Sequence, residues 1–343
     1  MIDDNSKVKA KNFETDEIGN DTIVMVKDLV HKYGEFTAVD GISFTVNRGE
    51  IFSFLGPNGA GKTTTINVMI GLLKPISGEV YVDGINIIKS SEKVKDKVGI
   101  VFQETLLDRE MTVWESMEFH GKLYKIPKDE RHAKIWELLE LVELHEKPDE
   151  LTKWLSGGMK RRLEIARALM TEPPILFLDE PTLGLDPQGR VLIWEQIEKI
   201  NKRGTTIFLT THYMEEADKL ANRVFIMDHG KILISGTPER LKDTLGKDVV
   251  YLYLMEKERA KGAIEDLDFI REIVEFDKGL ELLLHGSGIP LVPRIMEVLD
   301  DLKPKLVVDG VNIKRPSLDD VFLYFTGRKI IRENETYKHN FHH

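Results

Sequence analysis

A glycine-rich segment at residues 56–63 constrains this chain more than any other feature, because it stands between an apolar strand pattern and a helical pattern. It reads Gly-Pro-Asn-Gly-Ala-Gly-Lys-Thr and fits the phosphate-loop pattern G-x-x-x-x-G-K-[ST]. Glycines allow consecutive backbone N–H groups to surround a phosphate, and the following helix directs its positive end toward it. A glycine-rich turn without a ligand is the alternative, but the order of strand, loop and helix favours nucleotide binding.

The polar residues of this loop have expected roles. Lys62 would reach the β- and γ-phosphates, and Thr63 would offer its hydroxyl to magnesium. We therefore predict a bound nucleotide with Mg2+, and the family resemblance given below implies that the nucleotide is ATP. The residues that we assign to nucleotide contact are Gly56, Pro57, Asn58, Gly59, Ala60, Gly61, Lys62, Thr63 and Thr64.

A second nucleotide element is expected at residues 175–180, where an apolar strand pattern ends in two carboxylates. The first acid, Asp179, would hold magnesium, often through water. Glu180 lies one residue beyond the strand and is placed to polarise an attacking water as general base. Acids after an apolar strand are common in α/β proteins, so the assignment depends on the phosphate loop upstream.

Strand and helix patterns alternate along residues 23–247, which predicts an α/β core of the P-loop NTPase type. Residues 104–170 carry almost only helical periodicity, and we interpret about 104–155 as a helical subdomain inserted in the core. A polar tail over residues 1–22 would precede this domain. The expected strands are 23–30, 36–46, 50–55, 99–102, 175–178, 206–210 and 223–227.

Residues 248–316 predict a second, smaller domain. Their pattern is strand, helix, strand, strand, helix, strand, which is the βαββαβ order of a ferredoxin-like α+β domain. Residues 317–343 would add a terminal helix over 317–325 and a polar tail. In that tail His339, His342 and His343 could bind a metal ion, but we favour a solvated end of the chain.

Composition limits the partners. Across 343 residues, 48 Lys and Arg oppose 58 Asp and Glu, for a net charge of -10. This charge repels nucleic acid phosphates and an anionic bilayer, so neither is an expected direct partner. The chain has no cysteine, which excludes disulfides and thiolate catalysis. Apolar runs are too short to span a membrane, and no signal peptide is apparent. A cytoplasmic protein is expected.

Five motifs in a fixed order carry a resemblance to a known family. Gln103 lies at a strand end, Ser156-Gly157-Gly158 precedes a helix, and the Asp179-Glu180 pair follows, then Gly184-Leu185-Asp186 and His212. With the phosphate loop, this order resembles the ABC ATPases over residues 23 to about 245. One departure is Met159, where many members carry glutamine. That difference puts a polar contact near the ribose in doubt.

The resemblance implies how these motifs act. ABC ATPases sandwich two ATP molecules in a head-to-tail dimer, between the phosphate loop of one subunit and the signature of the other. Ser156, Gly157 and Gly158 would then bind nucleotide across the interface. The resemblance also implies adenine stacking for Tyr33, water and magnesium sensing for Gln103, interface coupling for Asp186 and γ-phosphate contact for His212.

Each of these residues also has a plainer interpretation. Tyr33 could be a core tyrosine, Gln103 a surface amide and His212 a loop histidine. Asp186 and Ser156 could be simple helix caps. The order of the motifs favours the functional interpretation.

The C-terminal pattern, with Pro316-Ser317-Leu318 and Thr326-Gly327-Arg328, resembles the drug- and polysaccharide-exporter subgroup that includes daunorubicin-resistance ATPases. Such a protein would drive a separate membrane permease, pair with a second copy of itself and lie at the inner face of the cell membrane. The alternatives are an importer ATPase, or a soluble ABC ATPase that acts on ribosomes or DNA. The single phosphate loop and the absence of cysteine and long heptads argue against the soluble class.

Overall fold

The computed structural model describes residues 21–326, and the chain divides into two compact units, Met1–Ser235 and Gly236–His343. This boundary lies earlier than the sequence prediction at residue 247. The reason is that α8 (Pro238–Asp243) packs on α11 (Leu318–Thr326), so that Leu241 and Leu245 are buried in the second unit. No helix between residues 21 and 326 is both long and apolar enough to cross a membrane.

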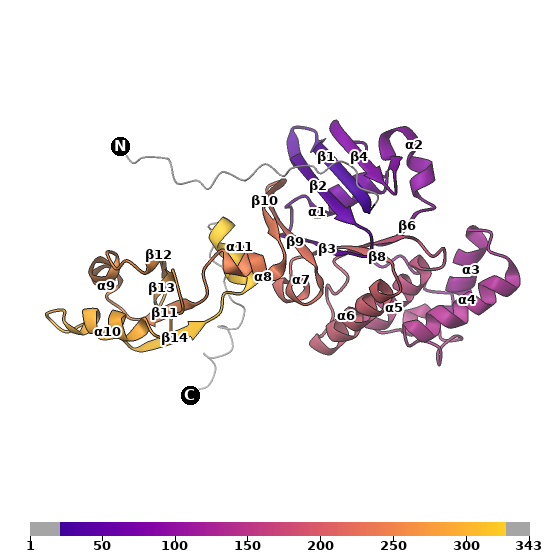
Figure 1. Ribbon diagram of the computed structural model, residues 1–343. Helices are drawn as coiled ribbons and strands as arrows, with labels where there is room; N and C mark the ends of the chain where they lie inside the picture. Colours follow the sequence, from indigo (N-terminus) through magenta and orange to yellow (C-terminus); the bar gives the residue numbers. More distant parts are fainter. Residues whose placement is uncertain (1–20, 327–343) are drawn as a thin grey trace. The chain divides into compact units, whose positions relative to one another are not determined.

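A six-stranded sheet forms the centre of the first unit, with the strand order β10-β9-β3-β8-β7-β6 (Figure 1). Strand β3 pairs in parallel with β8 and β9, and β7 pairs in parallel with β8 and β6. The carboxyl ends of these strands therefore meet at one edge of the sheet, where α/β proteins bind ligands. The strands are β3 (Ile51–Leu55), β6 (Val98–Val101), β7 (Ile175–Asp179), β8 (Thr206–Thr211), β9 (Arg223–Asp228) and β10 (Lys231–Gly236).

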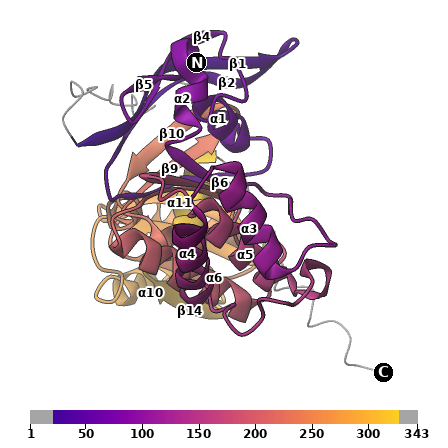
Figure 2. The ribbon, with the colours of Figure 1, turned by 90° about the vertical axis from the view of Figure 1, so that its right-hand side faces the viewer.

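A four-stranded antiparallel sheet with the order β2-β1-β4-β5 covers one side of this layer. Figure 2 shows it above β6, with α1 and α2, while α3, α4, α5 and α6 lie below. Its members are β1 (Thr22–Tyr33), β2 (Phe36–Asn47), β4 (Ser77–Val82) and β5 (Ile85–Asn86), accompanied by α1 (Lys62–Met69) and α2 (Ile87–Val94).

The two faces of the central sheet bury different side chains. Along β7, Leu176 and Leu178 belong to the cluster on the helical side, whereas Phe177 belongs to the cluster under the antiparallel sheet. This alternation is the period of two of a strand that is buried on both faces. On the second side Phe52 and Phe208 stack with ring centroids 4.8 Å apart. The central sheet is thus fixed from both sides by dense apolar packing.

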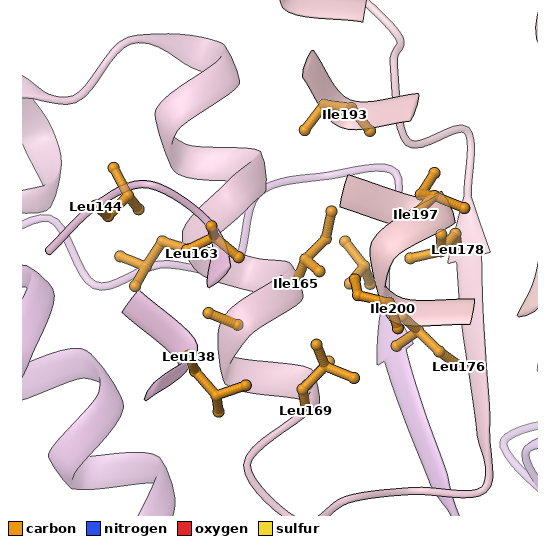
Figure 3. Packing of buried hydrophobic residues seen from close by; sticks show 14 of the residues in the cluster. Leu138, Leu144, Leu163, Ile165, Leu169, Leu176, Leu178, Ile193, Ile197 and Ile200 are labelled. Carbon is orange, nitrogen blue, oxygen red and sulfur yellow. The ribbon is translucent and has the colours of Figure 1, made fainter. Parts of the chain in front are cut away.

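Helix α5 (Gly157–Ala168) joins the helical subdomain to the core. Figure 3 shows Leu163 facing Leu138 and Leu144, while Ile165 faces the side chains of α6 and β7. The other helices of the unit are α3 (Val113–Leu123), α4 (Lys128–Leu141), the 3-10 turn η1 (Thr152–Trp154), α6 (Pro187–Lys202) and α7 (Met214–Leu220). Thr112 and Glu115 begin α3 with a reciprocal capping box.

The second unit contains an antiparallel sheet with the order β12-β13-β11-β14. Together with its helices this gives the βαββαβ order that the sequence predicted. One face of the sheet packs on α9 and α10 through a cluster that includes Leu252 and Leu282. The elements are β11 (Val249–Tyr253), α9 (Lys257–Ile264), β12 (Ile270–Phe276), β13 (Gly279–Leu284), α10 (Val292–Asp300), β14 (Gly310–Lys314), α8 and α11.

A buried carboxylate fixes the start of α11. Asp320 accepts hydrogen bonds from the Ser317 N–H (2.8 Å) and from Lys314 Nζ (3.0 Å), and it also receives the Tyr251 hydroxyl (3.2 Å). The Ser317 hydroxyl in turn accepts the Asp320 N–H at 3.3 Å. Ser317 and Asp320 therefore form a reciprocal cap at the start of this helix.

The sequence missed five elements of the fold. Strands β4, β5 and β10 and helices α2 and α8 had no predicted counterpart, and the last strand begins at Gly310 rather than at residue 306. Strand β5 has only two residues, and β4 carries Ser77, Gly78 and Glu79 at its start, which weakens a strand pattern. The histidines at 339, 342 and 343 lie outside the described residues, as does Gly327.

Candidate nucleotide-binding and catalytic site

The phosphate loop connects β3 to α1 at the carboxyl edge of the central sheet. Two of its glycines are required by close approach of other backbone atoms. A Cβ on Gly56 would lie 2.3 Å from the Met227 carbonyl oxygen, and one on Gly61 would lie 2.4 Å from that of Ala38. Gly61 also has φ of 102°, which favours glycine. Asn58 and Gly59 at the tip of the loop are exposed.

Lys62 is the buried cation of this loop, with 4% of its surface exposed. Its Nζ donates to the carbonyl oxygens of Gly56 (2.7 Å) and Pro57 (3.1 Å), and it lies 3.5 Å from Glu180 Oε1. Burial lowers the pKa of Lys62, while the charges of Glu180 and Asp179 oppose that shift. A buried ammonium at a glycine-rich helix start fits a phosphate group.

Asp179 ends β7 and contacts two hydroxyls. The Thr63 hydroxyl donates to Asp179 Oδ1 at 3.1 Å, and the Thr210 hydroxyl of β8 donates to the same oxygen. Burial raises the pKa of Asp179, and the two hydroxyl contacts oppose this effect. A threonine hydroxyl beside a carboxylate is the oxygen donor pair that Mg2+ uses in phosphate-loop sites, so these two residues fit that ion.

Glu180 follows Asp179 directly, and other residues hold both its side chain and its backbone. Its Oε2 lies 3.1 Å from His212 Nδ1, and its backbone N–H donates to the Thr210 carbonyl oxygen at 3.1 Å. Burial would raise the pKa of Glu180, but the contact with His212 and the charge of Lys62 outweigh it and hold the pKa below its ordinary value. The side chain therefore stays a carboxylate, the form that accepts a proton.

The backbone of Glu180 is unusual, because its φ of 48° is left-handed in a residue that is not glycine. Such a conformation costs about 1 to 3 kcal/mol and persists only where the surroundings enforce it. Here the Thr210 contacts hold the N–H side, and Arg161 Nη2 donates to the Glu180 carbonyl oxygen at 3.3 Å. The turn directs the carboxylate away from β7 toward Lys62 and His212.

The structure thus joins five of the sequence-assigned residues by direct contacts, namely Lys62, Thr63, Asp179, Glu180 and His212. Lys62 and Thr63 begin α1 after β3, Asp179 and Glu180 lie at the end of β7, and His212 follows β8. These three strands are neighbours in the sheet. Parallel strands end at the same edge, so residues far apart in sequence meet there.

Five further assigned residues make no hydrogen bond or ion pair with this cluster within the described residues 21–326. Ser156 caps α5, with its hydroxyl accepting the Met159 N–H at 3.2 Å, and Gly157 is exposed. Asp186 caps α6 by accepting the Gly189 N–H at 2.7 Å. Tyr33 ends β1 with 50% exposure. Gly158 follows Gly157 in the first turn of α5.

Gln103 follows β6 with an exposed side chain. Its backbone contacts a neighbouring residue of the site, because its carbonyl oxygen accepts a hydrogen bond from Arg161 Nη2 at 3.1 Å. Sequence reasoning did not single out Arg161 or Thr210. Thr210 ends a predicted strand two residues before His212, which was an available signal, whereas the carbonyl contacts of Arg161 leave no pattern in the sequence.

Residues 39–183 match the family described as ABC transporter. A daunorubicin resistance ATP-binding protein of Streptomyces coeruleorubidus is 36% identical over 312 residues, which cover 90% of this chain and 96% of that protein. A Nod factor export ATP-binding protein I of Ralstonia nicotianae is 37% identical over 91% of this chain and 96% of its own length.

Solved structures give the same result for the fold. A subunit of an ABC transporter complex from Clostridium perfringens has a TM-score of 0.61 and 32% identity, covering 72% of this chain and 96% of that one. A dimeric ATP-binding cassette with bound ADP and phosphate has a TM-score of 0.57 and 31% identity, covering 62% and 98%. The P-loop NTPase fold and the family resemblance are confirmed. The chain belongs to the ATP-binding proteins of ABC transporters, which are ATPases coupled to transport.

Proposed function

We propose that this chain hydrolyses Mg-ATP as a head-to-tail dimer and thereby powers a separate membrane permease that exports a drug-like, lipid or polysaccharide compound. The observation that carries the proposal is the placement of the Glu180 carboxylate between Lys62 Nζ at 3.5 Å and His212 Nδ1 at 3.1 Å. The names of the relatives, which describe drug resistance and Nod factor export, support the direction of transport.

In the proposed mechanism Glu180 takes a proton from water as the water oxygen attacks the γ-phosphorus of ATP. The bond between the γ-phosphorus and its bridging oxygen breaks, and the electron pair stays on the β-phosphate of ADP. Lys62 offsets negative charge on the phosphates, and His212 contacts both Glu180 and the γ-phosphate. Mg2+, when bound, would supply further charge neutralisation at the β- and γ-oxygens, held through Thr63, Asp179 and Gln103.

The second half of the nucleotide site would come from the partner copy. Ser156, Gly157 and Gly158 begin α5 without an acidic residue in its first turn, so this helix start suits an anion. Asp186 lies at the start of α6, on an exposed segment that would approach the partner. Tyr33, half-exposed at the end of β1, would stack on adenine. No nucleic acid contact is proposed.

For the permease we propose a groove on the first unit, between β6, α3 and α5. It has a volume of about 140 Å3, and its walls include Phe102, Leu106, His120 and Tyr124. Leu106 lines the groove with 55% of its surface exposed, so it is accessible to a partner. Burial lowers the pKa of His120 to about 4, with Arg167 adding to the effect, so His120 is neutral near pH 7. The groove is lined mainly by apolar side chains, with Glu164 and Arg167 as its charged members, and it suits a largely apolar segment of the permease.

The test is co-expression with a candidate permease, followed by separation of membranes from soluble protein. The proposal expects the chain in the membrane fraction only when the permease is present, at the cytoplasmic face. Leu106→Asp should reduce that association because it places a charge in the groove, whereas Ile76→Asp, an exposed position outside the groove with 61% exposure, should not. Association that is independent of the permease would contradict the proposal, and so would equal loss in both variants.

A further inference from the structure

Arg161 makes a set of contacts that no motif accounts for. It lies in α5, five residues after Ser156, and is 6% exposed. Its guanidinium donates to the carbonyl oxygens of Phe102, Gln103 (3.1 Å) and Glu180 (3.3 Å). One buried side chain therefore contacts three carbonyl groups in two backbone segments, and none of these contacts would be visible as a side-chain pattern in the sequence.

The three carbonyl groups belong to segments that the proposed mechanism uses. Phe102 and Gln103 follow β6, Glu180 follows β7, and Arg161 belongs to the helix that Ser156 begins. An arginine suits this position because its planar guanidinium presents five donors in a fixed geometry. A lysine ammonium on its flexible stem cannot hold all three acceptors in the same way.

Glu164 completes the arrangement one turn along α5. Its Oε2 lies 3.4 Å from Arg161 Nη1, and its Oε1 accepts the Leu106 N–H at 2.8 Å. The loop after β6 is therefore bound at two points, at Phe102 and Gln103 by the arginine and at Leu106 by the glutamate. If either Arg161 or Glu164 lost its partner, a buried charge would be left unpaired and the folded protein would be destabilised.

The neighbouring Arg162 shows that these contacts are not a general property of arginines on this helix. Its Nη1 donates to the carbonyl oxygen of Val142 at 3.0 Å and lies 3.7 Å from Glu143 Oε2. Both partners follow α4, in the helical subdomain. Arg162 therefore shares residue type, helix and carbonyl contacts with Arg161, but it does not touch the loop after β6 or Glu180.

We propose that Arg161 is a positioning residue for ATP hydrolysis, which fixes the backbone of Glu180 relative to the Gln103 loop and the signature helix. This inference rests on the proposed role of Glu180 as base. Arg161 acts through the carbonyl groups and not through the nucleotide. Because Glu180 is held in a left-handed conformation, the donor on its carbonyl helps set the direction of its carboxylate. Phe102 and Leu106 also line the groove proposed for the permease, so Arg161 directly connects that groove with Glu180.

The experiment compares full-length Arg161→Gln, Arg161→Lys and Arg162→Gln with the wild type. Turnover is measured with saturating Mg-ATP, and affinity is measured separately by equilibrium binding of a fluorescent ATP analogue. All assays are run at a temperature where circular dichroism shows each variant folded. We expect Arg161→Gln to lower kcat about 10- to 100-fold, since a displacement near 1 Å of a catalytic group costs about that much.

The Kd for the analogue should change less than about threefold in Arg161→Gln, because an interaction used only in the chemical step affects kcat alone. Arg161→Lys should fall between the wild type and Arg161→Gln, and Arg162→Gln should keep the wild-type kcat. The inference is overturned if Arg161→Gln turns over as fast as Arg162→Gln, or if kcat and affinity fall in equal proportion. If Arg161→Gln does not fold, Arg161→Lys is judged by the same criteria.

Glu180→Gln separates this inference from the proposed function. If Glu180→Gln keeps full turnover, the assignment of the base is wrong and the inference fails with it. If Glu180→Gln is inactive while both Arg161 variants turn over normally, the proposed function stands and the positioning role of Arg161 is rejected.

Discussion

Lys62 Nζ and Glu180 Oε1 face each other at 3.5 Å, with both side chains almost fully buried. The ammonium belongs to the phosphate loop and the carboxylate follows β7, so this contact joins the phosphate-binding and water-activating parts of the site. Each charge also offsets the burial of the other. Replacing either residue therefore affects more than its own function.

Glu180→Gln should trap an ATP-bound dimer. Glutamine keeps the size of glutamate but cannot accept a proton, so hydrolysis stops while the phosphate contacts remain. Each ATP would then bridge Lys62 of one copy and Ser156 of the other, which draws the two copies together by mass action. Size-exclusion chromatography with Mg-ATP should show a dimer for the variant and largely monomer for the wild type.

The control for the trapped dimer is Ser156→Arg in the Glu180→Gln background. Ser156 is exposed at the start of α5, so arginine there adds bulk and charge at the proposed interface without disturbing the core. The double variant should elute as a monomer. A Glu180→Gln protein that binds ATP but stays monomeric would show that the sandwich arrangement does not hold for this chain.

Lys62→Ala should abolish nucleotide binding, because the loop loses the buried cation that faces the phosphates. Glu180 would also lose a partner that holds its pKa low. Isothermal titration calorimetry with ATP checks this outcome. Lys199→Ala is the matched control, since Lys199 is half-exposed and pairs only weakly with Glu143 at 3.4 Å, and its variant should bind ATP normally. Undiminished binding by Lys62→Ala would refute the assignment of the loop.

Tyr33→Ala should weaken ATP affinity about tenfold, in line with the stacking energy of a base on an aromatic ring. Tyr33→Phe should bind ATP like the wild type, because stacking uses the ring and not the hydroxyl. His31 contacts the Tyr33 ring edge-on at a centroid distance of 4.8 Å and would remain in place in the phenylalanine variant. Equal losses in both variants would indicate a role for the hydroxyl instead.

His212→Ala should move the acidic limb of the kcat profile to higher pH. Glu180 has a lowered pKa in the folded protein, so it remains an ionised base below the pH at which an ordinary glutamate protonates. Removing the His212 contact raises that pKa, and the base is then lost at a higher pH. The check is kcat measured across the acidic range for wild type and variant. A lower kcat with an unchanged acidic limb would mean that His212 acts only through its contact with the γ-phosphate.

The second unit should be dispensable for hydrolysis, because every residue assigned to the reaction lies in the first.

Asp320→Ala should lower the free energy of unfolding by about 3 kcal/mol, since Lys314 and Tyr251 lose a buried partner. The pKa of Asp320 is lowered: burial would raise it, but Ser317 and Lys314 outweigh that. Its stabilisation is therefore complete above the pKa of an unfolded aspartate and is lost as pH falls through the lower folded value.

Chemical unfolding and ATPase assays on the same samples test this prediction. A chain that ends at Gly236 keeps β10 and removes α8 together with its packing partner α11, and it should retain hydrolysis. A cut at residue 247, the boundary expected from the sequence, would leave Leu241 and Leu245 without the surface that buries them. Folded protein without hydrolysis, from the Gly236 truncation, would make the second unit part of the reaction.

The central architecture could be predicted from the sequence because short stretches of the chain carry the patterns that specify it. The phosphate loop and the carboxylates after β7 each carry a side-chain pattern, and parallel strands then bring the motifs to one edge of the sheet. Strand β10 and the contacts of Arg161 carry no such signal. The arginine binds carbonyl oxygens, which every residue possesses, so its partners depend on the tertiary arrangement of β6, β7 and α5.

Thr210 has a consequence for how this site can change by substitution. Its hydroxyl contacts Asp179 Oδ1 and the Glu180 N–H, so a single small side chain on β8 supports both the proposed magnesium ligand and the proposed base. A substitution of Thr210 therefore changes the surroundings of both carboxylates at once, whereas a substitution of His212 changes the contacts of Glu180 and leaves those of Asp179 in place.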